Sequence, residues 1–208
     1  SFSTPTIRMT SVPAPRIFAP MLFKKFATST TCGSLAAFSI MVLPVAGWNV
    51  ESAAPGVLST YDETRFVNAI AETRSQCDVL VVYVHWGLEH QEKPEAYQRT
   101  LAQKYIEAGA DVVFGAHSHC LQGIEYIDGK PVFYSLGNFI FGSSIDRTMA
   151  VEMVVDKDGA ISYKLVGAKA ENGKTRQMNE LEQQQLNDYI NSISFGVTVQ
   201  DDGTVTAQ

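Results

Sequence analysis

The sequence predicts an α/β (α+β) domain in which a parallel β-α-β unit is followed by antiparallel hairpins. Two observations carry this prediction: helix and strand patterns alternate between residues 60 and 114, and short apolar strands flank turn residues after position 120. With 208 residues and 45% apolar residues, the chain is long and apolar enough to bury a core of its own.

The first half of this domain alternates helices and strands. Thr60 begins a capping box, and apolar residues recur behind it at helical spacing. Residues 79–84 form a continuous, β-branched run, which is typical of a strand buried on both faces. We expect Pro94 to open a second helix and Gly109 to end it, before a second buried strand at 111–114. This order indicates parallel strands joined by right-handed crossovers.

The part after residue 120 has a different pattern. The Asp128-Gly129 pair and the segment 156–159 are typical of tight turns, and each lies between two apolar runs. They predict two antiparallel hairpins. A last helix is indicated by apolar residues at helical spacing, namely Leu186, Tyr189, Ile190 and Ile193.

The N-terminal 50 residues differ from the rest in charge. The chain has 16 basic and 22 acidic residues, a net charge of −6, yet residues 1–50 contain four basic residues and no acidic one. We interpret residues 1–34 as an irregular segment, 35–195 as the folded domain and 196–208 as a polar tail. The apolar stretch 35–46 is either a buried strand or a signal-peptide core behind an internal start, and we favour the strand.

Composition argues against several function classes. The acidic balance argues against nucleic-acid binding, which normally needs a basic surface. No apolar run reaches the roughly 18–20 residues of a transmembrane helix, so we expect no transmembrane segment in this chain. The cysteines, Cys32, Cys77 and Cys120, are odd in number and lack a C-x-x-C spacing. A disulfide framework and a four-cysteine zinc site are therefore not expected, although one bridge stays open.

All four histidines lie between residues 85 and 119. His85 directly follows the first buried strand, and His117 and His119 follow the second. Because adjacent parallel strands open into the same crevice at their carboxyl ends, we expect these three imidazoles to converge. Imidazole is a common ligand of zinc, iron and manganese, so the pattern predicts a divalent-metal site. The alternative, three hydrogen-bonded structural histidines, stays open, and His90 is predicted to face solvent.

Other residues near these histidines have less specific signals. Glu89 either supports a ligand histidine or a bound water, or is a solvated loop carboxylate. Asn138 follows another strand and either caps a turn or lines the pocket, with the turn role favoured. We interpret Cys120 as a small buried hydrophobe rather than a thiolate ligand, and Trp86 as a packing aromatic. The sequence assigns no catalytic residue.

Longer motifs resemble a known family. Residues from about 35 to 165 resemble the bacterial capsule synthesis CapA family, most clearly in His85-Trp86-Gly87-Leu88-Glu89, Gly109-Ala110-Asp111, Gly115-Ala116-His117-Ser118-His119 and Tyr134-Ser135-Leu136-Gly137-Asn138-Phe139-Ile140-Phe141. The resemblance implies the C-terminal half of a calcineurin-like metallophosphoesterase sandwich. It also implies a role in poly-γ-glutamate capsule biosynthesis or export.

The resemblance further implies roles for the histidines. His85 is similar to the lone histidine of one metallophosphoesterase block, and His117 and His119 are similar to a Gly-His-x-His block. On that scheme His85 and His117 serve one ion and His119 serves another. The superfamily's Asp-x-His, Gly-Asp and Asn-His blocks have no counterpart in this chain. The resemblance therefore implies a partial site for at most one ion, either Mn, Fe or Zn, and leaves enzymatic activity open.

Partners and location are expected on the same basis. The resemblance implies contact with the capsule-synthesis machinery or a polyanionic polymer, at the bacterial cell envelope and outside the cytoplasm. Two alternatives stay open: a dimetal phosphoesterase completed by another segment or chain, and a non-catalytic remnant. The first predicts hydrolysis of a phosphodiester, and the second predicts no thermal shift when metal is added.

Overall fold

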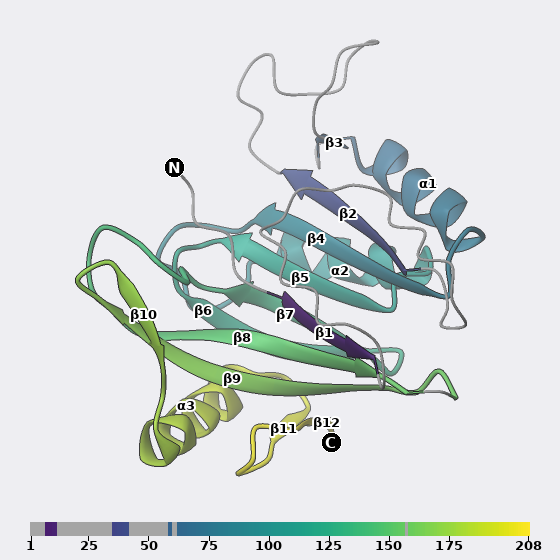
Figure 1. Cartoon of the computed structure of the whole chain (residues 1–208). Helices are drawn as coiled ribbons and strands as arrows, with labels where there is room; N and C mark the ends of the chain where they lie inside the picture. Colours follow the sequence, from purple (N-terminus) through teal and green to yellow (C-terminus); the bar gives the residue numbers. More distant parts are fainter. Residues whose placement is uncertain (1–6, 12–34, 42–57, 60–61, 157) are drawn as a thin grey trace.

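The computed structural model describes residues 7–11, 35–41, 58–59, 62–156 and 158–208 (Figure 1). The first sheet contains β2 (Leu35–Met41), β3 (Leu58–Ser59), β4 (Val79–Trp86), β5 (Val112–His117), β6 (Leu121–Ile127) and β7 (Lys130–Leu136). The second sheet contains β1 (Ile7–Ser11), β8 (Ile145–Val155), β9 (Ile161–Glu171) and β10 (Lys174–Gln177). The strand orders are β3-β2-β4-β5-β7-β6 and β1-β8-β9-β10.

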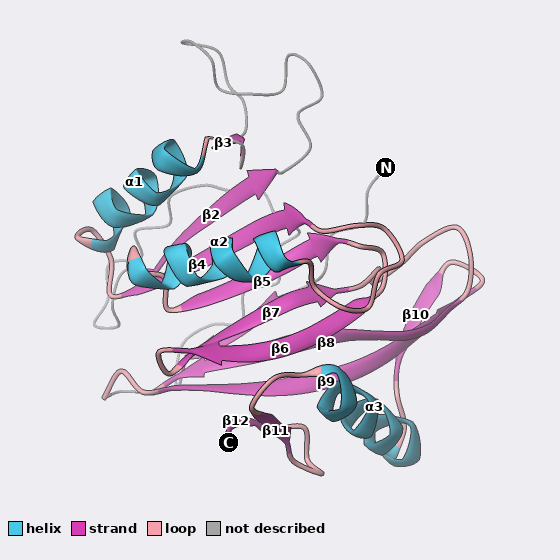
Figure 2. Cartoon of the chain, turned by 180° about the vertical axis from the view of Figure 1, so that it is seen from behind, coloured by secondary structure: helices cyan, strands magenta, loops and turns pink. Residues whose placement is uncertain are grey.

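The first sheet confirms the predicted parallel unit. β2, β4, β5 and β7 pair in parallel as neighbours, and β6 pairs antiparallel with β7 at the edge. Helices α1 (Glu63–Arg74) and α2 (Ala96–Glu107) lie on one face of this sheet (Figure 2). The predicted strand at 35–46 is confirmed over 35–41, and residues 42–46 lie outside the described residues. The α+β class is therefore confirmed.

Two apolar layers hold the structure together. Phe66, Leu80 and Tyr105 belong to a fully buried cluster between the first sheet and its two helices. Phe114 and Met149 belong to a second cluster, which lies between the two sheets. Because the central strands β4 and β5 contact both layers, their side chains are buried on both faces, as their continuous apolar runs indicate.

The helix starts differ from the sequence predictions. α1 is capped by Asp62, whose carboxylate accepts from Arg65 N at 3.1 Å, and Thr60 lies outside the described residues. α2 begins after Glu95 rather than at Pro94, because the Gln98 side chain accepts from Glu95 N at 2.7 Å and fixes the cap there. Gly109 follows the α2 C-cap with φ +112°, as its predicted helix-ending role requires.

Both predicted hairpins are confirmed, β6 with β7 and β8 with β9. The predicted last helix is α3 (Glu180–Ile193), which packs against β6 and β9. The described residues contain no helix of the length and apolarity that a bilayer crossing requires.

Both chain ends correct the sequence interpretation. The predicted polar tail instead forms a hairpin of β11 (Val197–Val199) and β12 (Val205–Ala207), with Val197, Val199 and Val205 buried. Each strand has only three residues, so its alternation of apolar and polar residues is too short to be recognised in the sequence. Within the segment predicted to be irregular, residues 7–11 form β1, which pairs in parallel with β8. This pairing joins segments far apart in the chain, so the five residues of β1 do not by themselves indicate it.

Candidate functional site

The carboxyl ends of β4 and β5 bring two histidines into contact. The parallel register places His85 beside Ala116 and Trp86 beside His117. His117 Nδ1 lies 2.8 Å from His85 Nε2, and the ring centroids are 4.5 Å apart. One of these two nitrogens therefore carries the proton of a hydrogen bond, and the other accepts it.

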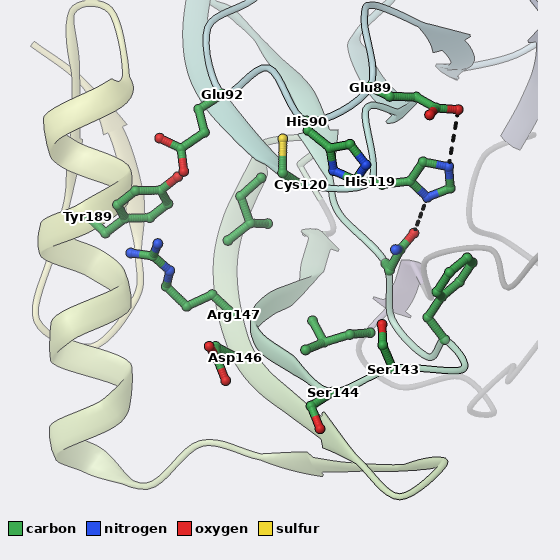
Figure 3. A pocket seen from close by; sticks show the side chains of 14 residues that line it. Glu89, His90, Glu92, His119, Cys120, Ser143, Ser144, Asp146, Arg147 and Tyr189 are labelled. Carbon is green, nitrogen blue, oxygen red and sulfur yellow. Dashed lines mark hydrogen bonds and ion pairs between the residues drawn. The ribbon is translucent and has the colours of Figure 1, made fainter.

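His119 lies farther along the same edge, with its ring centroid 6.3 Å from that of His117. Its Nδ1 is 2.8 Å from Asn138 Oδ1, and its Nε2 is 3.8 Å from Glu89 Oε1 (Figure 3). An amide oxygen only accepts, so Nδ1 carries the proton and the lone pair of a neutral ring lies on Nε2. Asn138 thus lines the pocket and orients His119, rather than serving only in a turn.

Burial keeps the imidazoles of His85 and His117 uncharged at neutral pH. Desolvation, followed by the neighbouring His117 and His119, lowers the pKa of His85 to about 4. Desolvation also lowers the pKa of His117, and His119 acts in the same direction, while Glu89 opposes it. Neutral imidazole is the form that binds metals, so no net charge has to be removed from this pair before an ion can bind.

The pair fits part of a metal site. Two nitrogens bound to one ion at about 2.1 Å stand roughly 3.0–3.4 Å apart, so a small opening of the 2.8 Å contact would admit an ion. However, no three His, Cys, Asp or Glu side chains of the described residues form a group that could hold a metal. His85 and His117 can supply two ligands, and His119 is not part of a closed cluster with them.

The histidine backbones are unusual. His90, His117 and His119 have φ values of +61°, +101° and +58°, a region that non-glycine residues rarely adopt. Such conformations cost on the order of 1–3 kcal/mol and concentrate at functional sites.

This strain gives a testable prediction. We expect His117→Gly to be more stable than His117→Ala by about 1 kcal/mol, because glycine adopts positive φ without a Cβ penalty. Urea unfolding of the two variants measures the difference. At position 116, where φ is not positive, Ala116→Gly should instead destabilise the protein. Equal stability of the two His117 variants would show that the backbone relaxes when the imidazole is removed.

A buried glutamine pair fixes the loop that carries Glu89 and His90. Gln98 Nε2 donates to Gln122 Oε1 at 3.1 Å, and Gln122 Nε2 donates to Gln91 O at 2.8 Å. Both glutamine side chains are fully buried. His90 itself is exposed, as predicted, and its backbone N–H donates to Ser118 O at 2.7 Å. Nothing in the sequence connects α2 with β6, so this pair could not be predicted from the sequence.

A pocket of about 460 Å³ opens beside His119. Its wall comes from the loops after β4, β5 and β7, the start of β8, and α3 (Figure 3). The wall includes Cys120, which is partly exposed rather than buried as predicted; desolvation still raises the pKa of its thiol, which favours the neutral thiol over a thiolate. Trp86 is also a packing residue, since it is fully buried and donates to Tyr134 O at 2.9 Å. His85 and His117 are not part of the pocket wall.

Comparison with known proteins places this site in a family. Residues 32–143 match the profile described as bacterial capsule synthesis protein PGA_cap. The chain belongs to this family. The match confirms the resemblance seen in the sequence, and it includes all five predicted site residues: His85, Glu89, His117, His119 and Asn138.

Three similar proteins have names that refer to capsule or polymer synthesis. The chain is 41% identical over 102 residues to "PGA biosynthesis protein CapA" of Bacillus subtilis (strain 168), covering 49% of this chain and 27% of that protein. It is 36% identical over 107 residues to "Capsule biosynthesis protein CapA" of Bacillus anthracis, covering 50% and 26%. A "probable polyglutamine synthesis accessory protein" of Mycobacterium tuberculosis is 33% identical over 63 residues, covering 30% and 17%. The chain thus matches about a quarter of the length of the two Bacillus relatives.

Proposed function

We propose that this chain acts in poly-γ-glutamate capsule biosynthesis or export, as a CapA-type protein with a partial site for one divalent ion. The observation that carries the proposal is the contact between His85 and His117 at the strand ends, within the segment that matches the capsule-synthesis family. His119, oriented by Asn138, is the third candidate ligand. The ion would be Mn, Fe or Zn, and its remaining ligands would be water or groups outside the described residues.

An ion at this position would supply Lewis acidity and charge stabilisation at the open end of the sheet. The chain's own contribution is to present neutral imidazoles at that edge and to hold His119 by its Nδ1 proton. Glu89, with its side chain 57% exposed and 3.8 Å from His119, can approach that ring or a bound water. The residues thus favour binding of a metal over a purely structural role for the histidines.

Metal binding gives a direct test. Titration of Mn²⁺, Zn²⁺ or Fe²⁺ into the purified chain should raise its melting temperature with dose. A ligand at 100 times its Kd adds about 2.7 kcal/mol to the stability of the native state. We expect His85→Ala and His117→Ala to lose this shift and the metal found by elemental analysis, while His90→Ala, which removes an exposed histidine, keeps both. A wild-type chain without any shift, or equal loss in His90→Ala, would contradict the proposed site.

The capsule role is tested in the organism that encodes the chain. Deletion of its gene should lower the amount of surface poly-γ-glutamate, and the wild-type gene should restore it. A gene carrying His117→Ala should restore less polymer than one carrying Asp188→Ala, a change at an exposed residue of α3. Unchanged polymer after deletion would contradict the role, whatever the metal titration shows.

We infer from the same capsule-synthesis family that the protein acts at the cell envelope. Fractionation of cells that express a tagged chain, followed by immunoblotting, tests this location. Recovery of the chain only with the cytoplasmic fraction would contradict it.

A further inference from the structure

The pocket beside His119 contains an arginine packed on a tyrosine ring, and this pair has no role in the proposed metal site. The guanidinium carbon of Arg147 lies 3.9 Å from the centre of the Tyr189 ring. Burial and the adjacent Glu92 carboxylate raise the pKa of that tyrosine, so it stays a neutral surface for stacking. Arg147 comes from β8, Tyr189 from α3 and Glu92 from the loop after β4 (Figure 3). Arg147 and Tyr189 lie outside the segment matched by the family.

Arg147 is available to a ligand. It makes no hydrogen bond or ion pair with any other residue that the structure describes, and its side chain is exposed at the pocket wall. The guanidinium carbon lies over the Tyr189 ring, which holds the cation at the pocket wall while its N–H groups have no hydrogen-bond partner among the described residues. A guanidinium held in this way is suited to binding a carboxylate through two parallel hydrogen bonds.

The rest of the wall has the opposite charge. Glu89, Glu92 and Asp146 face the same pocket, in which Arg147 is the only Lys or Arg among the described residues. The three carboxylates and one guanidinium give a formal charge of −2 before the histidines are counted. A ligand that placed several negative charges inside this pocket would be repelled by these carboxylates, and a purely cationic ligand would leave Arg147 unpaired. A group with one carboxylate and one ammonium matches both parts of the wall.

The chemistry of a γ-linked glutamyl chain contains one such group. Each link uses a side-chain carboxyl, so an interior unit keeps its α-carboxylate while its amine becomes an amide. Only the amino-terminal unit keeps both an α-ammonium and an α-carboxylate on the same carbon. The interior of the polymer is therefore polyanionic, whereas its amino end is locally zwitterionic.

We propose that this pocket binds the zwitterionic amino-terminal unit of a γ-glutamyl chain, with Arg147 holding the α-carboxylate and the acidic wall holding the α-ammonium. The identification of the ligand as a glutamyl polymer rests on the proposed function, whereas the inference that the ligand is zwitterionic rests on the pocket alone. The volume of about 460 Å³ is within the range of small-ligand sites. Arg147 is on this basis a specificity-determining residue.

Calorimetric titration of the 208-residue chain with matched dipeptides tests the proposal, in EDTA so that no ion occupies the carboxylates. The reference probe is γ-glutamyl-glutamate. Its N-acetyl form lacks only the ammonium, and 4-aminobutyryl-glutamate lacks only the α-carboxylate. We expect each of these two to bind at least about tenfold weaker than the reference, the effect of losing one charge-assisted hydrogen-bonded pair. Free glutamate, titrated in parallel, measures how much affinity the zwitterionic head alone provides.

The variant Arg147→Gln separates a contact from a general effect on folding. In this variant the affinities for γ-glutamyl-glutamate and 4-aminobutyryl-glutamate should become equal, because the guanidinium that binds the α-carboxylate is gone. Arg65→Gln, on the exposed surface of α1, should keep the wild-type difference. The proposal is overturned if γ-glutamyl-glutamate does not bind, if acetylation leaves its affinity unchanged, or if Arg147→Gln keeps the difference between the two dipeptides.

The outcomes also separate this proposal from the capsule role. If gene deletion lowers surface polymer but the dipeptide does not bind, the capsule role stands and the pocket assignment falls. If the dipeptides bind in the expected order but deletion leaves the polymer unchanged, the pocket chemistry stands and the capsule role falls.

Discussion

Replacing Gly115 with alanine is expected to lower the free energy of unfolding by about 3 kcal/mol, because the new methyl group has no space. An added Cβ would lie 2.0 Å from Tyr134 O and 2.5 Å from Trp86 Nε1. Those two atoms are joined by a buried hydrogen bond of 2.9 Å. The substitution must therefore displace a backbone carbonyl of β7, the Trp86 ring or both, in the centre of the sheet that carries His85 and His117.

Urea unfolding followed by circular dichroism measures this effect, with Gly142→Ala as the matched control. A Cβ added at Gly142 would have no atom within 4 Å, and the residue has no positive φ, so that variant should stay within about 0.5 kcal/mol of the wild type. Equal unfolding midpoints for the two variants would show that β5 and β7 can separate without cost, contrary to the packing described above.

Replacing Asp111 with alanine is expected to lower the free energy of unfolding by about 2–3 kcal/mol, because it removes several charge-assisted hydrogen bonds at once. The carboxylate accepts from Arg74 at 2.5 Å, from Lys130 at 3.0 Å and from Leu80 N at 2.8 Å. These contacts tie α1, β4 and β7 to the start of β5, at the end opposite His117. The alanine variant leaves two cations and one backbone N–H without this partner.

The effect of Asp111 should depend on pH. Desolvation alone would raise the pKa of Asp111, but the hydrogen bonds from Leu80, Lys130 and Arg74 outweigh it and hold the pKa below its ordinary value. A carboxylate with a lowered native pKa stabilises the protein fully above its unfolded pKa of about 4, and this stabilisation is lost as the pH falls through the native pKa. The stability difference between wild type and Asp111→Ala should therefore be constant from about pH 7 to 5 and narrow below about pH 4.

Asp188→Ala is the control for this series. Asp188 is exposed on α3, so its loss should change stability by no more than about 0.5 kcal/mol at any of these pH values. A wild-type to Asp111→Ala difference that does not narrow in the acidic range would argue against the ionised network as its cause.

Local patterns in the sequence were sufficient to predict the central strands, the two larger hairpins and the three helices of the fold. The β-branched run at 79–84 and the shorter one at 112–114 predict strands buried on both faces, and both strands lie at the centre of the first sheet. The turn at Asp128-Gly129 has positive φ at both residues, as its hairpin requires. Signals that depended on one side chain were less exact: α2 begins one residue after the capping Glu95 and not at Pro94. A cap is decided by competing hydrogen bonds, which differ little in energy.

The candidate site, like the fold, could be predicted from the sequence only in part. The positions of His85, His117 and His119 behind parallel strands predict that they lie at one edge of the sheet, because topology alone places strand ends together. Their roles as metal ligands remain a prediction. The pairing of His119 with Asn138 could not be chosen over a turn role from the sequence, since the two residues are 19 positions apart and meet through the loops after β5 and β7.

By itself, the sequence determined the α+β class, the family and the edge of the sheet where the histidines gather, because these follow from short-range periodicity and from motifs in their order along the chain. Only the tertiary structure decided which groups share a pocket with His119. Arg147 and Tyr189 are far apart in the sequence and have no motif in common, yet the packing of α3 against β6 and β9 brings Tyr189 under Arg147 of β8. Tertiary packing also closes residues 197–207 into a hairpin, where the sequence pattern indicates a polar tail. Long-range burial decides such contacts, and it depends on the whole folded chain rather than on any local pattern.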